Sequence, residues 1–201
     1  MKTSGCVGLP NWCLPEPLKF KIMNKADIIT DLQNVNHHFS STCNAIEETV
    51  FFEKPGNKWS VAENVQHLVL SVSTTTLAFQ LPKLLVRLIG GKPNRPSGSF
   101  EELKAKYYCK LDEGAKASSR YVPKPILHRA GKEKLLDKWN KVNSKLIYVL
   151  THNNSEQELD AYLVKHPLLG RITLRELCYF TVFHTQHHLN SIAKTHAAEK
   201  S

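Results

Sequence analysis

The sequence predicts an all-α fold, a four-helix bundle with a short extra helix and a long loop between the second and third long helices. Two observations lead to this prediction. Apolar residues recur at three- and four-residue steps in four long segments, which is the spacing of helices with one buried face. Such helices need partners for their apolar stripes, and a bundle provides them. No segment shows a convincing strand pattern.

The first long helix is expected from Asp27 to about Ile46. Its apolar residues Ile28, Leu32, Val35 and Phe39 all fall on one helical face. A loop, "EKPGNK", follows it.

The second long helix begins with a capping box, in which Ser60 precedes Glu63 by three residues. Helical spacing continues to Leu81. Pro82 is expected to bend or end the helix, and Gly90 with Gly91 ends what remains.

A second capping box, Ser99 with Glu102, starts the short extra helix, which runs through Leu111. Residues 114–131 contain two prolines and are expected to form the long loop.

The third long helix is expected from about Lys132 to Asn153. The sequence "HPLLGRITLRE" then predicts a turn into the last helix, where Thr173 and Glu176 form a third capping box.

The length of 201 residues, with 41% hydrophobic residues, suits one domain. Residues 1–22 hold three prolines and no apolar signal core, so they are expected to be an irregular N-terminal arm. The bundle is expected to occupy residues 23–201. A helical pattern opens at Met23, which is also compatible with a start there and an upstream extension.

The net charge of +9 is concentrated between Lys83 and Lys145. Clustered Lys and Arg can bind nucleic acid, but no stacking pattern or groove-reading motif accompanies them. We expect a solvated helix face and a basic loop, which could also attract small anionic substrates. No apolar run is long enough to span a membrane, so no membrane association is expected.

The five cysteines form no CxxC pair and are widely spaced except for the first two. This pattern predicts reduced thiols and a cytoplasmic location.

Three histidines fall within five positions of the last helix, in "HTQHH". His184 and His188 are four residues apart, so their side chains share one face and can reach one metal ion. His187 points about 100° away from His188 and is expected at the rim of a site or to have no role there.

A third ligand has to come from another helix, and His67 is the candidate. It belongs to a polar stripe with Asn64, Ser71 and Thr74 on a helix otherwise rich in Val and Leu. The alternative is that these histidines are hydrogen-bonded or surface residues. His166 is expected to be a structural hydrogen-bonding residue in a loop. A surface location is expected for the remaining histidines, His37, His38, His128, His152 and His196.

Two segments resemble motifs of the DinB-like superfamily of metal-binding four-helix bundles. Residues 58–68, "KWSVAENVQHL", resemble W-S-x-x-E-x-x-x-H-L at the start of that superfamily's second helix. Residues 166–192, "HPLLGRITLRELCYFTVFHTQHHLNSI", resemble its closing segment, a His-Pro-x-x-Gly turn and a helix ending in H-x-x-x-H-H or H-x-x-H-H.

The resemblance implies that His67, His184 and His188 are the metal ligands. It also implies a divalent ion, most often zinc or nickel, and a homodimer. Some similar proteins are thiol-dependent transferases or isomerases, so a low-molecular-weight thiol is a possible cosubstrate.

Three imidazoles leave coordination positions open for a small-molecule substrate, as in a catalytic ion site. Such an ion can generate a hydroxide or thiolate nucleophile at neutral pH. The helix lacks H-E-x-x-H, so a peptidase is not expected, and the capping box already accounts for Glu63. No catalytic residue can be assigned. The sequence therefore predicts a metal-dependent transferase or hydrolase. The alternative is a non-catalytic stress-response or binding protein with a structural or vestigial metal site.

Overall fold

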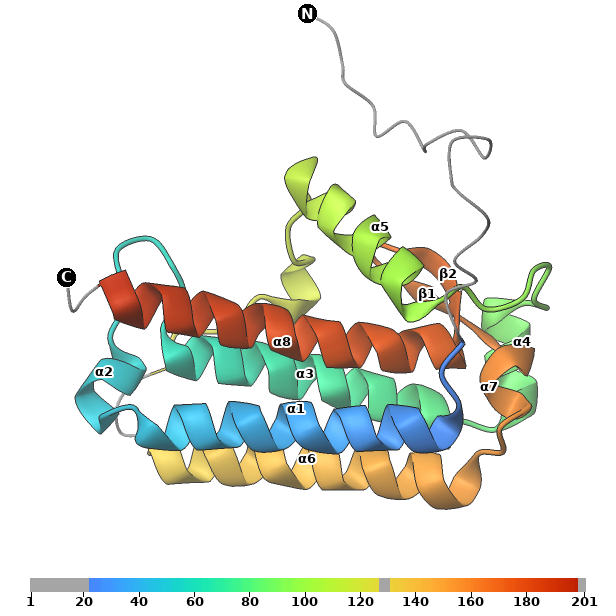
Figure 1. Cartoon of the computed structure of the whole chain (residues 1–201), viewed down its shortest axis with the longest axis horizontal. Coiled ribbons are helices and arrows are strands. Elements are labelled where there is room, and N and C mark those ends of the chain that lie inside the picture. The colour runs from blue at the N-terminus through green and yellow to red at the C-terminus, as the bar shows by residue number, and fades with distance from the viewer. Residues whose placement is uncertain (1–21, 127–130, 199–201) are drawn as a thin grey trace, which may run out of the picture.

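Four long helices lie side by side in a computed structural model that describes residues 22–126 and 131–198 (Figure 1). They are α1 (Lys25–Ala45), α3 (Val61–Gln80), α6 (Lys132–Asn153) and α8 (Leu174–Ala198). Each packs against two others, because α6 contacts α1 and α3, and α8 contacts the same two helices. The predicted four-helix bundle is confirmed.

Helix α1 begins after Asn24, whose side chain accepts a hydrogen bond from the backbone N–H of Asp27 at 2.8 Å. This cap satisfies one of the free donors of the first turn. The buried residues of α1 follow the predicted stripe: Ile28, Leu32, Val35, Phe39 and Cys43. The observed bounds differ from the expected ones by one or two residues, within the usual uncertainty of helix ends.

Helix α3 has the predicted capping box. The Ser60 hydroxyl accepts from the N–H of Glu63, and the Glu63 carboxylate accepts from the N–H of Ser60. The helix ends at Gln80, before Pro82, and α4 (Lys83–Gly90) turns away from it by 113°. Pro82 therefore ends α3.

Helix α4 packs against the chain near Leu163. A Cβ atom at Gly90 would lie 1.7 Å from the carbonyl oxygen of Leu163, so only glycine permits this approach. The opposite face is apolar and exposed, with Leu84 at 72%, Leu88 at 73% and Ile89 at 62%.

The extra helix α5 (Phe100–Asp112) lies across α8 and carries the predicted capping box of Ser99 and Glu102 (Figure 1). The loop after it contains a single 3-10 turn, η1 (Ser119–Tyr121), up to residue 126. Two further short helices, α2 (Glu48–Phe52) and α7 (Glu158–Ala161), were not predicted. Each is shorter than two helical turns, too short for a periodic pattern.

The expectation of no strand is wrong. Strands β1 (Leu163–His166) and β2 (Gly170–Thr173) form an antiparallel hairpin, with Leu163 opposite Thr173 and His166 opposite Gly170. Four residues are too few to show alternation clearly. The closing turn, Pro167 to Leu169, was recognised, but the pairing of its flanks was not.

The start of α8 is fixed by a buried carboxylate. Glu176 accepts hydrogen bonds from the backbone N–H of Thr173 at 2.8 Å and of Gly98 at 2.7 Å, and it pairs with Arg95 at 2.6 Å. The first bond completes the predicted third capping box, with the Thr173 hydroxyl as its other half. The same side chain thus joins the loop before α5 to the first turn of α8.

Several predictions concern residues that the structure does not describe. The irregular arm expected at residues 1–22 lies almost wholly outside the described residues, as do His128 and the end of the long loop. Within the described residues, Cys43 and Cys178 are free and buried. Cys109 is not among the free cysteines of the described residues.

In the described ranges, no single helix has the length and apolar composition needed to cross a membrane. Only α3 and α4 taken together meet those two criteria, across the bend between them.

Candidate metal centre

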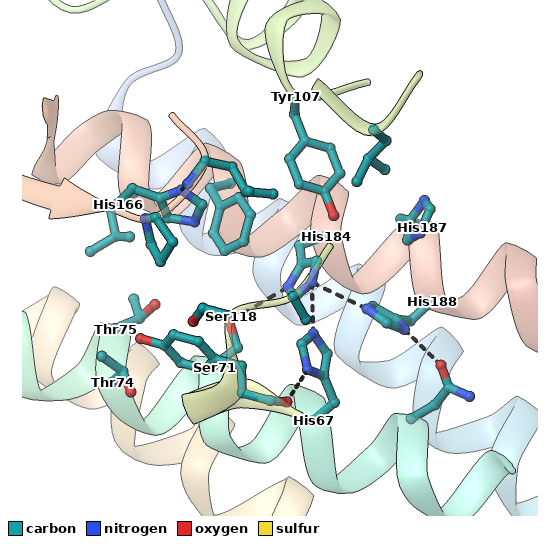
Figure 2. A pocket seen from close by; sticks show the side chains of 18 of the residues that line it. His67, Ser71, Thr74, Thr75, Tyr107, Ser118, His166, His184, His187 and His188 are labelled. Carbon is teal, nitrogen blue, oxygen red and sulfur yellow. Dashed lines mark hydrogen bonds between the residues drawn. The ribbon is translucent and has the colours of Figure 1, made fainter. Parts of the chain in front are cut away.

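The three predicted histidines meet in the interior of the bundle (Figure 2). His67 comes from α3, and His184 and His188 come from successive turns of α8. The Nε2 atom of His184 lies 3.1 Å from that of His67 and 3.2 Å from that of His188. All three residues are buried, with exposures of 4%, 5% and 7% for His67, His184 and His188. The side chains of His67 and His184, 117 residues apart in sequence, thus converge on one site.

The other ring nitrogen of each histidine has its own partner. The Nδ1 of His67 lies 2.7 Å from the backbone carbonyl oxygen of Tyr121, which can only accept. The Nδ1 of His188 lies 2.7 Å from the side-chain oxygen of Asn64. His184 has a longer contact, 3.5 Å, from its Nδ1 to the Ser71 hydroxyl. Because the Nδ1 atoms of His67 and His188 carry the donated protons, their Nε2 atoms are unprotonated. The Nε2 lone pairs of both rings therefore point toward the centre of the three-histidine cluster.

The orientation of Asn64 is set by the start of its own helix. Its amide nitrogen donates to the carbonyl oxygen of Ser60 at 2.8 Å, so its amide oxygen faces His188. Ser60 is also the capping residue of α3. The N-terminal turn of one helix thereby fixes the tautomer of a histidine on another.

This donor set fits a metal ion. Nitrogen ligands at about 2.0 to 2.1 Å from an ion would lie roughly 2.9 to 3.4 Å apart for angles between 90° and the tetrahedral value. The two Nε2 separations, 3.1 and 3.2 Å, fall in this interval. Ligating histidines usually donate their second N–H to a carbonyl or carboxylate, and two of these three donate to carbonyl oxygens.

Burial keeps the three imidazoles in their neutral, ligating form. Desolvation lowers the pKa of His67, and it lowers the pKa of His184 and His188 well below the ordinary value of 6.5. The neighbouring histidines lower the pKa of His184 and His188 further, because a second positive charge in the cluster would be repelled. At neutral pH none of the three carries a competing proton.

Aromatic rings hold the cluster in place. The Trp59 ring is nearly parallel to that of His188, at 4° and 6.1 Å between centroids, and it also contacts His67 at 5.0 Å. Phe180 stacks on His184 at 4.6 Å. These contacts restrict ring rotation and keep the Nε2 atoms directed toward one another.

The cluster opens on one side into a cavity of about 440 Å³. Its lining is mostly apolar or aromatic, with the polar stripe of α3 along one wall. Ser71 and Thr74 from that stripe both line the cavity, as Figure 2 shows. This volume is within the range of small-molecule sites. The polar stripe of α3 therefore faces this cavity and the two histidines of α8.

The remaining histidines take the places predicted for them where the structure describes their side chains. His187 is half-buried, lines the cavity and lies outside the converging group, with its ring at 88° to that of His188. The Nδ1 of His166 accepts from the N–H groups of Leu168 and Leu169, so this residue is a structural hydrogen-bonding residue, although at the end of a strand. His37, His38 and His152 are exposed.

Three contributors to the site were not recognised in the sequence. The carbonyl of Tyr121 orients His67 from a loop without any pattern. Trp59 belongs to a motif that the sequence shows, but no role was predicted for it, and none was predicted for Tyr107 of α5. A backbone carbonyl has no sequence signal, and the position of α5 over α8 depends on tertiary packing.

Comparison with known proteins agrees with this architecture. The sequence model of the DinB superfamily matches residues 32–192, and the chain belongs to that superfamily. No curated protein shows significant sequence similarity to it.

Among solved structures, the chain is similar to YfiT from Bacillus subtilis, described as a probable metal-dependent hydrolase with an unusual four-helix bundle topology. The TM-score is 0.58 at 15% sequence identity, over 93% of this chain and 94% of YfiT. At this identity the likeness shows a shared fold.

Replacing His188 by Ala is expected to abolish metal binding, because it removes one of three converging nitrogens. Replacing the adjacent His187 by Ala is expected to leave most of it. Elemental analysis of protein purified without nickel resin and dialysed against zinc measures both variants. Equal loss in the two variants would mean that the helical phase of the site is wrong.

The stability of the metal-free protein is expected to fall as the pH falls from 6.5 to 5. The unfolded histidines bind protons near pH 6.5, whereas burial lowers the pKa of His67, His184 and His188, and lowers that of His166 to about 4. Below 6.5 the unfolded state therefore binds more protons, and acidification favours it by about 1.4 kcal/mol per pH unit for each such group. Urea denaturation over this pH range measures the slope.

His37→Gln is the control variant, because His37 is exposed and lies outside the cluster. His166→Gln should reduce the dependence of the unfolding free energy on pH by the contribution of one proton, about 1.4 kcal/mol per pH unit. A free energy of unfolding that is constant over the range would contradict neutral, buried histidines.

Proposed function

We propose that this protein is an enzyme that depends on a divalent metal ion, zinc or nickel, and acts on a small molecule. One observation carries the proposal: three neutral, buried Nε2 atoms converge at the wall of a cavity large enough for a ligand. A structural ion would be enclosed by its protein ligands, whereas a three-histidine set beside a cavity leaves positions open.

His67, His184 and His188 would hold the ion, which supplies Lewis acidity and lowers the pKa of a bound water or thiol. Asn64 and Tyr121 keep two of the three rings in the tautomer that presents Nε2. The apolar and aromatic walls limit the water around the site.

The nature of the cavity lining bears on the reaction. No Asp or Glu is among the described residues that line it. Glu63 is committed to the cap of α3 and to an ion pair with Lys54 at 2.8 Å. A reaction that needs a carboxylate base is therefore disfavoured.

We propose transfer of a low-molecular-weight thiol to an electrophilic small molecule as the first candidate reaction. The thiol loses its proton to solvent, and its sulfur forms a bond to the electrophilic carbon. The bond from that carbon to a leaving group, such as chloride, breaks with its electron pair, and the anion departs to solvent. Such a thiol needs no protein base, because binding to a metal ion favours the thiolate directly. Hydrolysis is the second candidate, supported by the fold shared with YfiT, the probable metal-dependent hydrolase.

A homodimer and a cytoplasmic location remain proposals. The exposed apolar face of α4 offers a surface that a second copy could cover, and sedimentation velocity would test it, with a monomer at all concentrations as the contrary result. The buried free thiols of Cys43 and Cys178 suit a reducing compartment. We propose no nucleic-acid partner, because no groove-reading motif accompanies the exposed basic residues of α6, such as Lys134.

The activity assay pairs monochlorobimane with several low-molecular-weight thiols, and runs a generic ester in parallel. Chelation is expected to reduce one of the two reactions at least 100-fold, and zinc or nickel to restore it, because the nucleophile forms only beside the ion. His67→Ala should behave like chelated protein, while His152→Ala, at an exposed position, should retain the wild-type rate. A folded, metal-loaded protein inactive in both assays would favour the non-catalytic alternative.

A further inference from the structure

Tyr107 lies directly over the three-histidine site. It belongs to α5, and its side chain is almost fully buried, with 4% of the residue exposed. Its ring contacts Phe183 at 5.3 Å and Phe180 at 5.7 Å, both on α8. The same ring meets His184 at 6.1 Å in an edge-on arrangement. The packing of α5 against α8 therefore holds this phenol in one position.

The hydroxyl of Tyr107 is directed into the cavity. Figure 2 shows it pointing from α5 toward His184, while the ring carbons face α8. Tyr107 lines the cavity, and within the described part of the chain its hydroxyl makes no hydrogen bond. Phenols in protein interiors usually find a partner, so a hydroxyl that ends in a cavity is available to a ligand there.

The phenol of Tyr107 is neutral near pH 7, because its ordinary pKa is about 10 and burial raises this pKa further. Tyr107 therefore offers an O–H donor to a ligand in the cavity.

The charges around the cavity have one sign. Lys58 and Lys165 are the charged residues among those that line it, and no carboxylate accompanies them in the described lining. A ligand with an oxygen acceptor, neutral or anionic, thus meets an O–H donor beside the histidines and a positive potential near the cavity.

Resting on the function proposed above, we infer that Tyr107 is a ligand-binding residue whose O–H donates a hydrogen bond to an oxygen of the substrate beside His184. The ligand class that this arrangement selects is small carbonyl and oxyanion compounds, such as esters, amides, carboxylates and hydroxamates. Imidazole bound to the ion through one nitrogen gains nothing from the donor, because its other nitrogen carries a proton and cannot accept a hydrogen bond.

The test uses the protein loaded with cobalt(II), titrated with acetohydroxamate and separately with imidazole, and followed by visible absorption. Tyr107→Phe removes the hydroxyl and keeps the ring. It is expected to bind cobalt like the wild type, to weaken acetohydroxamate about tenfold, and to leave the imidazole dissociation constant within about twofold. One hydrogen bond to a charged or strongly polar oxygen accounts for a change of this size.

Tyr108→Phe is the matched control. Tyr108 is the next residue of α5, it is half-buried, and it does not line this cavity. Both dissociation constants should stay at the wild-type value in this variant.

Three results would overturn the inference: unchanged acetohydroxamate affinity in Tyr107→Phe, an equal loss for both ligands, or a wild-type cobalt protein that does not bind acetohydroxamate. The second would mean that the substitution disturbs packing. Failure of the wild type to bind cobalt at all would refute the metal-dependent function itself, and this inference with it.

Discussion

Two nitrogen-to-nitrogen separations near 3 Å, between rings buried in the bundle interior, are the constraint on which the site depends. Lone pairs that face one another at this distance repel unless something positive lies between them. Either a proton on His184 or a metal cation can fill that role. The hydrogen bonds at the opposite nitrogens of His67 and His188 place the ring protons on Nδ1, so both Nε2 lone pairs are available to a cation.

The bundle provides this convergence through contacts that lie outside the site. The cap of α3 orients Asn64, and Asn64 orients His188. Glu176 fixes the first turn of α8, about two helical turns before His184. The position of this turn determines where along α3 the histidines of α8 lie. The short hairpin leads into this turn, since β2 ends at Thr173. Elements that carry no ligand therefore determine where the ligands lie.

Much of this arrangement was predictable because it depends on local rules. The capping boxes at Ser60, Ser99 and Thr173 and the stop at Pro82 follow from hydrogen-bond chemistry over three or four residues. The pairing of His184 with His188 follows from helix geometry alone. His67 was identifiable because it lies on a polar stripe in an otherwise apolar helix.

Other features depend on contacts between distant segments, and the sequence does not show them. The four-residue strands are defined by pairing with each other, not by their own composition. The carbonyl of Tyr121 and the position of Tyr107 depend on how the segments after Gly91 fold over α3 and α8.

The central claim is that His67, His184 and His188 bind one ion through their Nε2 atoms while leaving a position open to the cavity. A crystal structure of the protein purified without added metal, with anomalous data at the zinc and nickel edges, tests it most directly. The account predicts one anomalous peak at about 2.0 to 2.1 Å from each of the three Nε2 atoms, with a non-protein ligand on the cavity side. A peak bound elsewhere, or a fourth protein ligand that closes the cavity side, would contradict it.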